Sequence, residues 1–598
     1  MIKTFRNIEK VAIYILVWIK LLTTPRQFLL LSSVIVGLFA GLAVVILKAF
    51  AYWVFVFANY LDSILKLPYS NSILPIIGIL LTVFIVQRFM GGHLEKGLSQ
   101  IMHSVARKKS LLPRKQIFAQ IITNSLTVGF GGSAGVESPV AVTGATFGST
   151  FAQHFKMSYK ERTLLLACGV AAATSTAFNA PIAGVLFAIE VILVDVSITA
   201  FIPIMISAAT GAIISTIFLG ESIVLHFYEK QLFEFSDIWF YIILGLITGW
   251  FSVYYSRYFQ KITEYFNKLK IKNPYKKAMF GASILAVLIF IVPTLFGQGY
   301  ESIKTLSGDN PNALLDGTIF SAFKDKTWAL LLFIGLASIL KVFAVGLTLN
   351  SGGNGGNFAP SIFVGSYLGF LFSNLVNLTN WFKVPVVSFT LVGMAGVFSA
   401  LFHAPLTAIF LIGEITGGYS LMIPLLVVSS ISFAVSKNYE SYSMDVRKLA
   451  KKGDVFTSNK DRNILTSIAI DEVLITDYKT LSAEDGLDKL IQIVTNSEQR
   501  NFAIVDQNNK IVGVLDFSLV REIVFSPLKV KYSKISEVMQ AAHILIYYEN
   551  SVYIMLQKLE QSGKDYLPII KDGKYYGFIS KIKILENYRI QLKSMRVE

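Results

Sequence analysis

The sequence has a single cysteine and few histidines. Cys168 stands alone among 598 residues, which excludes an intramolecular disulfide framework and a cysteine-based metal cluster. None of the six histidines, at positions 93, 103, 154, 226, 403 and 543, forms the His-Glu-x-x-His motif that an intramembrane metalloprotease requires. The sequence therefore predicts neither a metal site nor an enzyme.

Charged side chains are also scarce. They make up 15% of the residues, against about 25% in an ordinary soluble protein. Hydrophobic residues reach 54% and the mean hydropathy is +0.58, which excludes an ordinary soluble enzyme. The net charge is nevertheless +16. Long uncharged runs argue against the contiguous basic patch of a nucleic-acid-binding protein, so we interpret the excess as the positive cytoplasmic side of a protein embedded in the lipid bilayer of the cell membrane.

Charge density divides the chain into two parts. Apolar segments continue to about residue 440, and an ordinary polar sequence with helix and strand periods follows. We predict a transmembrane domain over 27–440, a linker over 441–466 and a soluble cytoplasmic tail. The basic, modestly amphipathic residues 1–26 predict an interfacial helix on the cytoplasmic side and not a cleavable signal peptide.

Several apolar stretches are short and broken by glycine and proline. Broken helices are tolerated at membrane depth where they are buried in protein or line a cavity, an arrangement typical of transporters. The stretches run from Gly129 to Pro139, Gly169 to Pro181, Gly352 to Pro360 and Gly393 to Pro405.

These stretches form an internal repeat. Small residues recurring at helix interfaces would explain matched Gly and Ala, but not matched Ser, Phe, Pro and Glu. Two repeats, over about 70–200 and 325–437, are therefore predicted to meet around a substrate site. The pairs 224 positions apart are Gly169 and Gly393, Ser175 and Ser399, Phe178 and Phe402, Pro181 and Pro405, and Glu190 and Glu414; those 221 apart are Gly135 and Gly356, Pro139 and Pro360, and Gly144 and Gly365.

The broken segments favour an anion as the substrate. Pro139 and Pro360 follow glycine-rich segments, as proline does in the first turn of a helix. Two helix N-termini would then point into the protein, and their free N–H groups attract anions without a cationic side chain. A divalent-cation transporter, the alternative from another class, needs several carboxylates, whereas Glu137 is the only charged residue between Lys115 and Lys156.

Three isolated carboxylates in the membrane part are candidate functional groups. Glu137 lies two residues before Pro139, where an ionised carboxylate occupies the place of the anion and a protonated one withdraws, so it is a candidate gate. The alternative is a glutamate that caps the helix through backbone N–H groups. Glu190 and Glu414 end apolar helices at matched repeat positions, and we predict structural pairing or buried hydrogen bonds for them.

The motifs together resemble the family of chloride channels and proton/chloride antiporters, the CLC family. Gly135-Val-Glu-Ser-Pro139 is similar to its Gly-Lys/Arg-Glu-Gly-Pro motif, and Gly356-Asn-Phe-Ala-Pro360 to its Gly-x-Phe-x-Pro motif. The resemblance implies a polytopic α-helical protein of inverted repeats with broken, tilted helices, and a homodimer with one chloride pathway per subunit. It also implies that Glu137 is the gating glutamate and that the anion is bound by Gly135, Val136, Gly356, Asn357 and Phe358.

The sequence departs from the first selectivity motif of the family. The counterpart of its Gly-Ser-Gly-Ile-Pro-Glu is identified as residues 90–95, Met-Gly-Gly-His-Leu-Glu, which lack the serine hydroxyl. The backbone amides of Gly91, Gly92 and His93 are then expected to replace that hydroxyl.

Two further departures concern protons and the pore. Val191 stands where many antiporters of the family carry a proton-transfer glutamate, after Glu190. A valine cannot relay a proton, which favours a voltage-gated-type chloride channel over an antiporter. Tyr442 fits the family's pore tyrosine best, although Tyr439 fits after a register shift. Fluoride is a minor alternative, because the motif of fluoride exporters, with threonine in place of Pro139, is missing.

The tail contains two similar strand-turn-strand units, in which Gly513 and Gly577 match. They resemble a tandem pair of CBS domains, predicted here over 467–525 and 526–590 as a small cytoplasmic α/β module. The Ser/Thr-x-x-Asp ending that often binds an adenine nucleotide in that family is intact in neither Asp516-Phe-Ser-Leu519 nor Ser580-Lys-Ile-Lys583. We predict a regulatory or dimerising module, with nucleotide binding left open. A CBS-bearing divalent-cation transporter is the alternative function.

Overall fold

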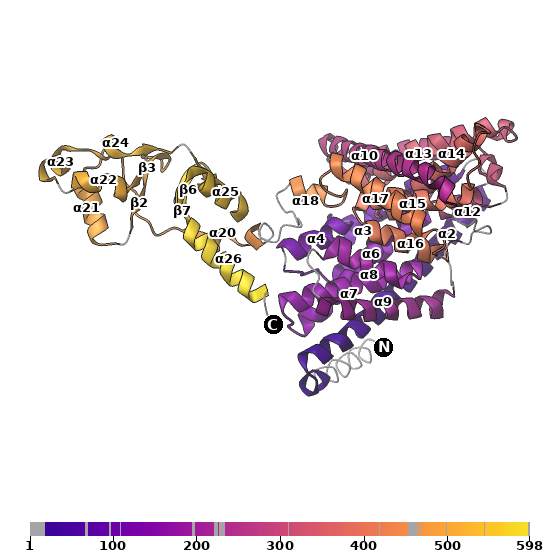
Figure 1. Ribbon diagram of the computed structural model, residues 1–598, viewed down its shortest axis with the longest axis horizontal. Coiled ribbons are helices and arrows are strands. Elements are labelled where there is room, and N and C mark those ends of the chain that lie inside the picture. Colours follow the sequence, from indigo (N-terminus) through magenta and orange to yellow (C-terminus); the bar gives the residue numbers. More distant parts are fainter. Residues whose placement is uncertain are drawn as a thin grey trace. The chain divides into compact units, whose positions relative to one another are not determined.

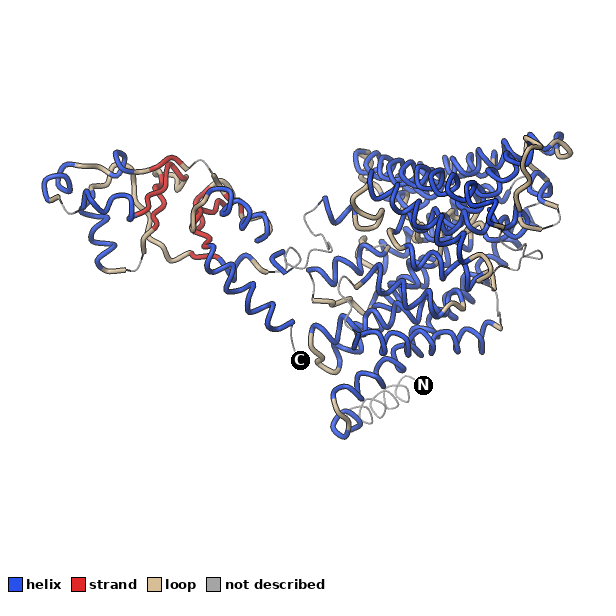
Figure 2. Tube along the Cα trace, viewed as in Figure 1, coloured by secondary structure: helices blue, strands red, loops and turns tan. Residues whose placement is uncertain are grey.

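The computed structural model divides the chain into two compact units, Met1–Lys452 and Gly453–Glu598. The residues that the structure describes are 18–65, 70–94, 97–107, 109–193, 198–220, 225, 234–308, 310–417, 419–451, 464–466, 468–497, 499–524, 526–542 and 544–595. Among these residues, named strands occur in the second unit alone (Figures 1 and 2). The unit boundary falls inside the predicted linker 441–466. Of the predicted helix over 1–26, residues 18–22 are helical and residues 1–17 lie outside the described residues.

The first unit is built of long and short helices. Seven of the described helices, α2, α9, α10, α11, α13, α14 and α17, are long and apolar enough to cross a membrane, whereas others are too short to cross it alone. This mixture makes the chain a multi-pass membrane protein with the broken helices that the sequence predicted. The helices are α2 (Pro25–Leu65), α3 (Leu74–Phe89), α4 (Leu98–Arg107), α5 (Lys115–Gly129), α6 (Glu137–His154), α7 (Tyr159–Phe178), α8 (Pro181–Phe187), η2 (Ala188–Ile192), α9 (Ile198–Leu219), α10 (Ile238–Lys268), α11 (Pro274–Ile291), α12 (Tyr300–Leu306), α13 (Thr327–Asn350), α14 (Phe358–Leu378), α15 (Val386–Phe402), α16 (Pro405–Ile415), α17 (Met422–Tyr439) and α18 (Arg447–Lys451).

One helix break occurs twice in this unit. Asn179 ends α7 and His403 ends α15, both in the left-handed conformation, with φ of 52° and 55°. Pro181 and Pro405 then begin α8 and α16. Non-glycine residues rarely adopt this conformation. Its occurrence at two positions 224 residues apart means that the sequence repeat is also a repeat of backbone geometry.

Two close helix crossings repeat as well. Gly144 on α6 packs against the backbone of Gly169 on α7, and Gly365 on α14 packs in the same way against Gly393 on α15. A Cβ atom added at Gly365 would lie 2.5 Å from the Cα of Met394. Small residues at these crossings let the helix backbones touch, as in other membrane helix pairs.

We expect Gly365→Ala to destabilise the protein by about 1–3 kcal/mol, because the added methyl group overpacks this backbone contact. Gly335→Ala is the matched control. Position 335 lies inside α13, where the nearest atom to an added Cβ is 3.8 Å away, so the substitution should be neutral or slightly stabilising. Thermal unfolding of the detergent-solubilised protein measures both, and equal melting temperatures for the two variants would contradict the crossing.

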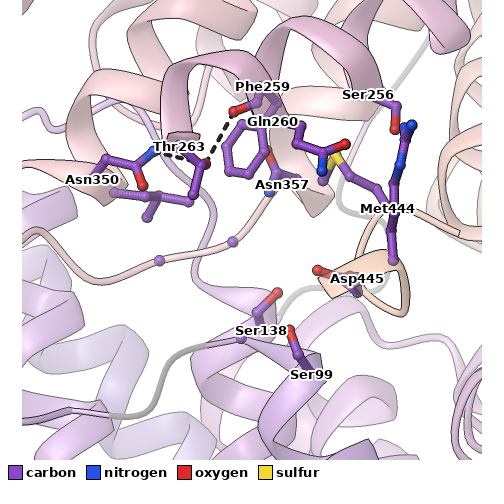
Figure 3. Close-up of a pocket in the computed structure, with 15 residues that line it drawn as sticks. Ser99, Ser138, Ser256, Phe259, Gln260, Thr263, Asn350, Asn357, Met444 and Asp445 are labelled. Carbon is purple, nitrogen blue, oxygen red and sulfur yellow. Dashed lines mark hydrogen bonds between the residues drawn. The ribbon is translucent and has the colours of Figure 1, made fainter. Parts of the chain in front are cut away.

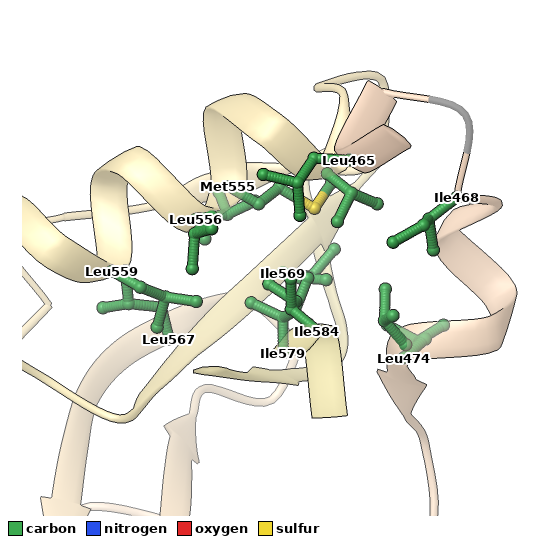
Figure 4. Close-up of a cluster of buried hydrophobic side chains, with 13 residues drawn as sticks. Leu465, Ile468, Leu474, Met555, Leu556, Leu559, Leu567, Ile569, Ile579 and Ile584 are labelled. Atoms are coloured by element: carbon green, nitrogen blue, oxygen red, sulfur yellow. The ribbon is translucent and has the colours of Figure 1, made fainter. Parts of the chain in front are cut away.

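The second unit contains two small sheets. One has the strand order β1-β7-β6-β5 and the other β2-β3-β4. The strands are β1 (Leu474–Ile475), β2 (Asn501–Val505), β3 (Ile511–Asp516), β4 (Gln540–Ala541), β5 (Ile546–Tyr547), β6 (Tyr566–Lys571) and β7 (Lys574–Ser580), and the helices are α20 (Ile470–Val473), α21 (Leu487–Thr495), α22 (Phe517–Val524), α23 (Pro527–Tyr532), α24 (Ile535–Val538), α25 (Val552–Ser562) and α26 (Lys581–Met595). Each sheet carries a separate apolar core, and Figure 4 shows the one around Ile569 and Ile579.

The two halves of this unit exchange strands. β1 lies in the first half but pairs with β7 of the second, and β4 lies in the second half but pairs with β3 of the first. The hairpin turns also meet, because the Tyr575 N–H donates to the Asn509 carbonyl at 2.8 Å. In both hairpins the register shifts directly after an Ile–Gly pair, Ile504 with Gly513 and Ile569 with Gly577. The predicted halves 467–525 and 526–590 are therefore interleaved through their sheets.

Candidate anion site

The two repeats meet at a pair of glycines. Gly135 and Gly356 exchange two backbone hydrogen bonds of 2.9 Å as an isolated antiparallel bridge. α6 begins two residues after Gly135, and α14 begins two residues after Gly356. A Cβ at Gly135 would overlap the carboxylate of Glu137, and one at Gly356 would overlap the hydroxyl of Ser138. Only glycine at both positions lets the N-termini of α6 and α14 start side by side.

The side chain of Glu137 is buried at this joint. Its Oε1 accepts a hydrogen bond from the Tyr300 hydroxyl at 3.0 Å, and its Oε2 accepts one from the Ala359 N–H at 3.4 Å. Ala359 lies in the first turn of α14, where N–H groups lack helical partners and the helix dipole is positive. The carboxylate of one repeat is thus held at the helix N-terminus of the other repeat, a position that favours negative charge.

The ring of Phe358 is buried among other aromatic rings. The ring packs against Phe178, Phe187, Phe398 and Phe402, with centroid distances of 4.5 to 5.7 Å. Phe178 and Phe402 are a matched pair of the internal repeat. With its side chain enclosed by four aromatic rings, Phe358 has only its backbone left to offer an anion.

A cavity of about 160 Å³ reaches the joint. Its wall includes Ser99 and Ser138 from the first repeat and Asn357 from the second, and Figure 3 shows Ser99 and Ser138 on the side opposite Asn357. The Asn357 amide oxygen accepts a hydrogen bond of 3.1 Å from the Tyr255 hydroxyl. The buried Ser256 hydroxyl, also in the wall, has no hydrogen-bond partner among the described residues. The cavity wall therefore carries several hydroxyl groups that can donate hydrogen bonds.

The structure places the predicted first selectivity segment outside this cavity. Gly91, Gly92 and His93 are exposed and do not line the cavity. The two glycines have φ of 71° and 80°, and the Gly92 N–H donates to the Val86 carbonyl at 3.1 Å, so they close the C-terminus of α3. Glu95 lies outside the described residues. The cavity is lined instead by residues 97 and 99, at the start of α4.

The other predicted positions and two missed tyrosines complete the site. Tyr442 is half-buried before α18 and is not part of the cavity wall, which its neighbours 444, 445 and 447 do line. Val191 is buried in the π-helical turn η2, and Val136 is buried at the start of α6. Sequence reasoning missed Tyr300 and Tyr255, whose hydroxyls contact Glu137 and Asn357, because neither lies in a repeat or motif.

Glu190 and Glu414 cap helices of the opposite repeat. Glu190 accepts hydrogen bonds from the N–H groups of Leu406 and Thr407 at the start of α16, at 3.1 and 2.8 Å. Glu414 accepts hydrogen bonds from the N–H groups of residues 182 and 183 at the start of α8, also at 3.1 and 2.8 Å. The Thr407 hydroxyl adds a bond of 2.7 Å to Glu190. The contacts are those of structural carboxylates at helix N-termini.

The fold and the joint together define a transport protein built from two repeats, with helix N-termini meeting inside the membrane part. The family model described as voltage gated chloride channel matches residues 77–437, more than half of the chain. The chain belongs to this family.

Similar proteins agree with this assignment. The H(+)/Cl(-) exchange transporter ClcA of Yersinia pseudotuberculosis is 27% identical over 416 residues, 68% of this chain and 83% of that protein. The voltage-gated ClC-type chloride channel ClcB of Escherichia coli is 27% identical over 334 residues, 55% of this chain and 75% of that protein. The crystal structure of a slow cyanobacterial Cl-/H+ antiporter superposes with a TM-score of 0.62 at 23% identity, covering 72% of this chain and 98% of that one. A eukaryotic CLC transporter structure, at 17% identity and a TM-score of 0.57, covers 93% of this chain and 97% of its own.

Proposed function

We propose that the protein carries chloride across the membrane along a pathway lined by backbone N–H groups and gated by Glu137. The observation that carries this proposal is the hydrogen bond from the Ala359 N–H, at the N-terminus of α14, to the Glu137 carboxylate. An ionised carboxylate bound there is itself an anion held by the opposite repeat, so a mobile anion is attracted to the same place. The similar H(+)/Cl(-) exchange transporter and chloride channel support chloride as that anion.

The proposed gating step is a competition for one position. When Glu137 is ionised, its carboxylate occupies the N-terminus of α14 and closes the pathway. When it is protonated, it no longer competes with an anion and the pathway opens. We assign the backbone of Gly135, Val136, Gly356, Asn357 and Phe358 to the pathway, because these residues form the joint. On the cavity side, the hydroxyls of Ser99, Ser138 and Ser256 supply further donors.

A chloride channel and a proton/chloride antiporter remain the two forms of this function. Val191 provides no carboxylate to pass a proton onward from Glu137, which favours the channel. Asp445 favours the antiporter, because this residue lines the cavity that also reaches Ser138, next to Glu137. A carboxylate at that place is a candidate proton carrier.

Flux from proteoliposomes, with chloride and protons recorded together, tests the function. Chloride efflux without coupled proton movement identifies a channel. Proton movement at a fixed proton-to-chloride ratio identifies an antiporter. Fluoride in place of chloride tests the anion preference. Proteoliposomes that release none of these anions above the level of empty liposomes would refute the proposal.

We also propose a homodimer in the cell membrane with both the N-terminal segment and the tail on the cytoplasmic side. The positive net charge supports this orientation through the positive-inside preference.

For the tail we propose a CBS pair with a regulatory or dimerising role, supported by the exchanged strands and the matched register shifts. In the two segments that correspond to the nucleotide-binding Ser/Thr-x-x-Asp ending, side chains already have partners within the tail. Asp516 accepts hydrogen bonds from the N–H and hydroxyl of Ser518, and Lys583 donates to the Leu474 carbonyl. ATP titration of the full chain tests nucleotide binding.

A further inference from the structure

A lysine is fully buried within the membrane part. Lys341 on α13 has no solvent-exposed surface, and its ammonium lies 4.7 Å from the centre of the Phe363 ring. It donates to the carbonyls of Leu295 at 3.4 Å and Gly297 at 3.2 Å. In the part of the chain that the structure describes, no carboxylate forms an ion pair with it. A buried cation at membrane depth is costly, which makes it a candidate for a functional role.

The carbonyls that Lys341 holds belong to the segment 295–299, which connects α11 to α12. The segment also bonds to the chain before α6, because the Gly297 N–H donates to the Gly131 carbonyl at 2.9 Å. Gly299 ends the segment with φ of 96°, and a Cβ there would lie 2.5 Å from the Phe363 ring. The segment is therefore fixed between α13, α14 and the chain that leads into α6.

This segment places the tyrosine that contacts the gate. Tyr300 follows Gly299 directly and is the first residue of α12, and its hydroxyl donates to Oε1 of Glu137 at 3.0 Å. Among the described residues, Lys48 on α2 also acts on Glu137 electrostatically, and α14 contributes the uncharged Ala359 N–H. Two contacts in series, Lys341 to the segment and Tyr300 to the carboxylate, thus connect a buried cation with the gate.

We propose that Lys341 is a positioning residue for the gate. By holding the segment 295–299, it keeps the Tyr300 hydroxyl on the Glu137 carboxylate and so sets the pH at which the pathway opens. This inference rests on the proposed function, because it requires Glu137 to gate an anion pathway. A hydrogen bond donated to the ionised carboxylate favours that form, so losing the bond lets Glu137 take up a proton at higher pH.

The test is the pH dependence of chloride flux from proteoliposomes. Tyr300→Phe should raise the pH of half-maximal flux by about one unit, since a hydrogen bond to a charged group is lost. Lys341→Met should raise it in the same direction. The double variant should shift no further than the larger single shift, because both substitutions remove the same contact. Additive shifts would overturn the proposal, since Lys341 would then act on the gate independently of Tyr300.

Lys341→Gln separates positioning from charge. Glutamine retains a donor for the carbonyls of the segment but carries no charge, so its pH profile should stay closer to the parent than that of Lys341→Met. A shift as large for glutamine as for methionine would overturn the proposal, because it would mean that the charge acts directly. If Lys341→Met does not fold, Lys341→Gln alone tests the proposal: a pH profile close to that of the parent supports it, and a shift as large as that of Tyr300→Phe overturns it. A failure of the proposed function is distinguishable, because the unsubstituted protein would then show no pH-gated flux at all.

Discussion

Replacing Glu137 with glutamine is expected to leave chloride flux open at every pH. Glutamine has nearly the same size as glutamate but cannot ionise, so it cannot compete as an anion for the N–H of Ala359. In the parent, the protonated fraction of a single carboxyl falls about tenfold for each pH unit above its midpoint, and flux should fall with it. In Glu137→Gln this dependence should disappear. Flux from proteoliposomes across a series of pH values measures both proteins.

Glu301→Gln is the matched control for this experiment. Glu301 is adjacent to Tyr300 on α12, but its side chain is 90% exposed and pairs with Lys304 across one helical turn. Its neutralisation should leave the pH profile unchanged. If Glu137→Gln retained the full pH dependence of the parent, the gating role would be refuted, and a capping role would be left for Glu137.

Removing the reciprocal capping carboxylates is expected to cause the largest losses of stability. Glu190→Ala removes three hydrogen bonds at the N-terminus of α16, and Glu414→Ala removes two at the N-terminus of α8. Hydrogen bonds to charged groups contribute about 1.5–3 kcal/mol each, although they do not add fully. We expect a loss of about 3 kcal/mol for Glu414→Ala and a larger loss for Glu190→Ala. Thermal unfolding in detergent gives the order.

The glutamine variants refine this comparison. Glu190→Gln and Glu414→Gln each retain one acceptor oxygen, so their melting temperatures should lie between those of the parent and the alanine variants. If Glu414→Ala were more destabilising than Glu190→Ala, the hydrogen bond from the Thr407 hydroxyl would not contribute as the geometry implies. If neither alanine variant lost stability, the two carboxylates would not be structural.

Much of the joint could be predicted because it repeats. Gly135 and Gly356 recur with a constant spacing, and a spacing survives in the sequence even when the fold is unknown. Tyr300 could not be predicted, because its hydroxyl reaches a residue 163 positions away and nothing local marks it. Gly91 and Gly92 lie outside the cavity, which the sequence could not show for a physical reason. A glycine pair that ends a helix with positive φ is indistinguishable, by composition, from a glycine pair that leads into one.

In the tail, the two hairpins could be predicted but their partners could not. The hairpins combine alternating apolar residues with turn residues such as Asp572 and Gly573, which are local signals. β1 and β4 are two residues long, too short to carry a period, and each pairs with the other half of the unit. Their pairing depends on tertiary packing, which a linear pattern does not encode.

The reciprocal capping has a consequence for how such a chain can arise. Glu190 satisfies the helix that begins at Pro405, and Glu414 satisfies the helix that begins at Pro181, so each repeat supplies what the other lacks. This is the self-complementary pattern of an isologous interface, in which residue i meets residue j and j meets i. Two identical copies of one repeat would satisfy both helix ends by the same contact used twice. The present chain has the geometry expected of a symmetric pair of half-length subunits that became joined and then diverged.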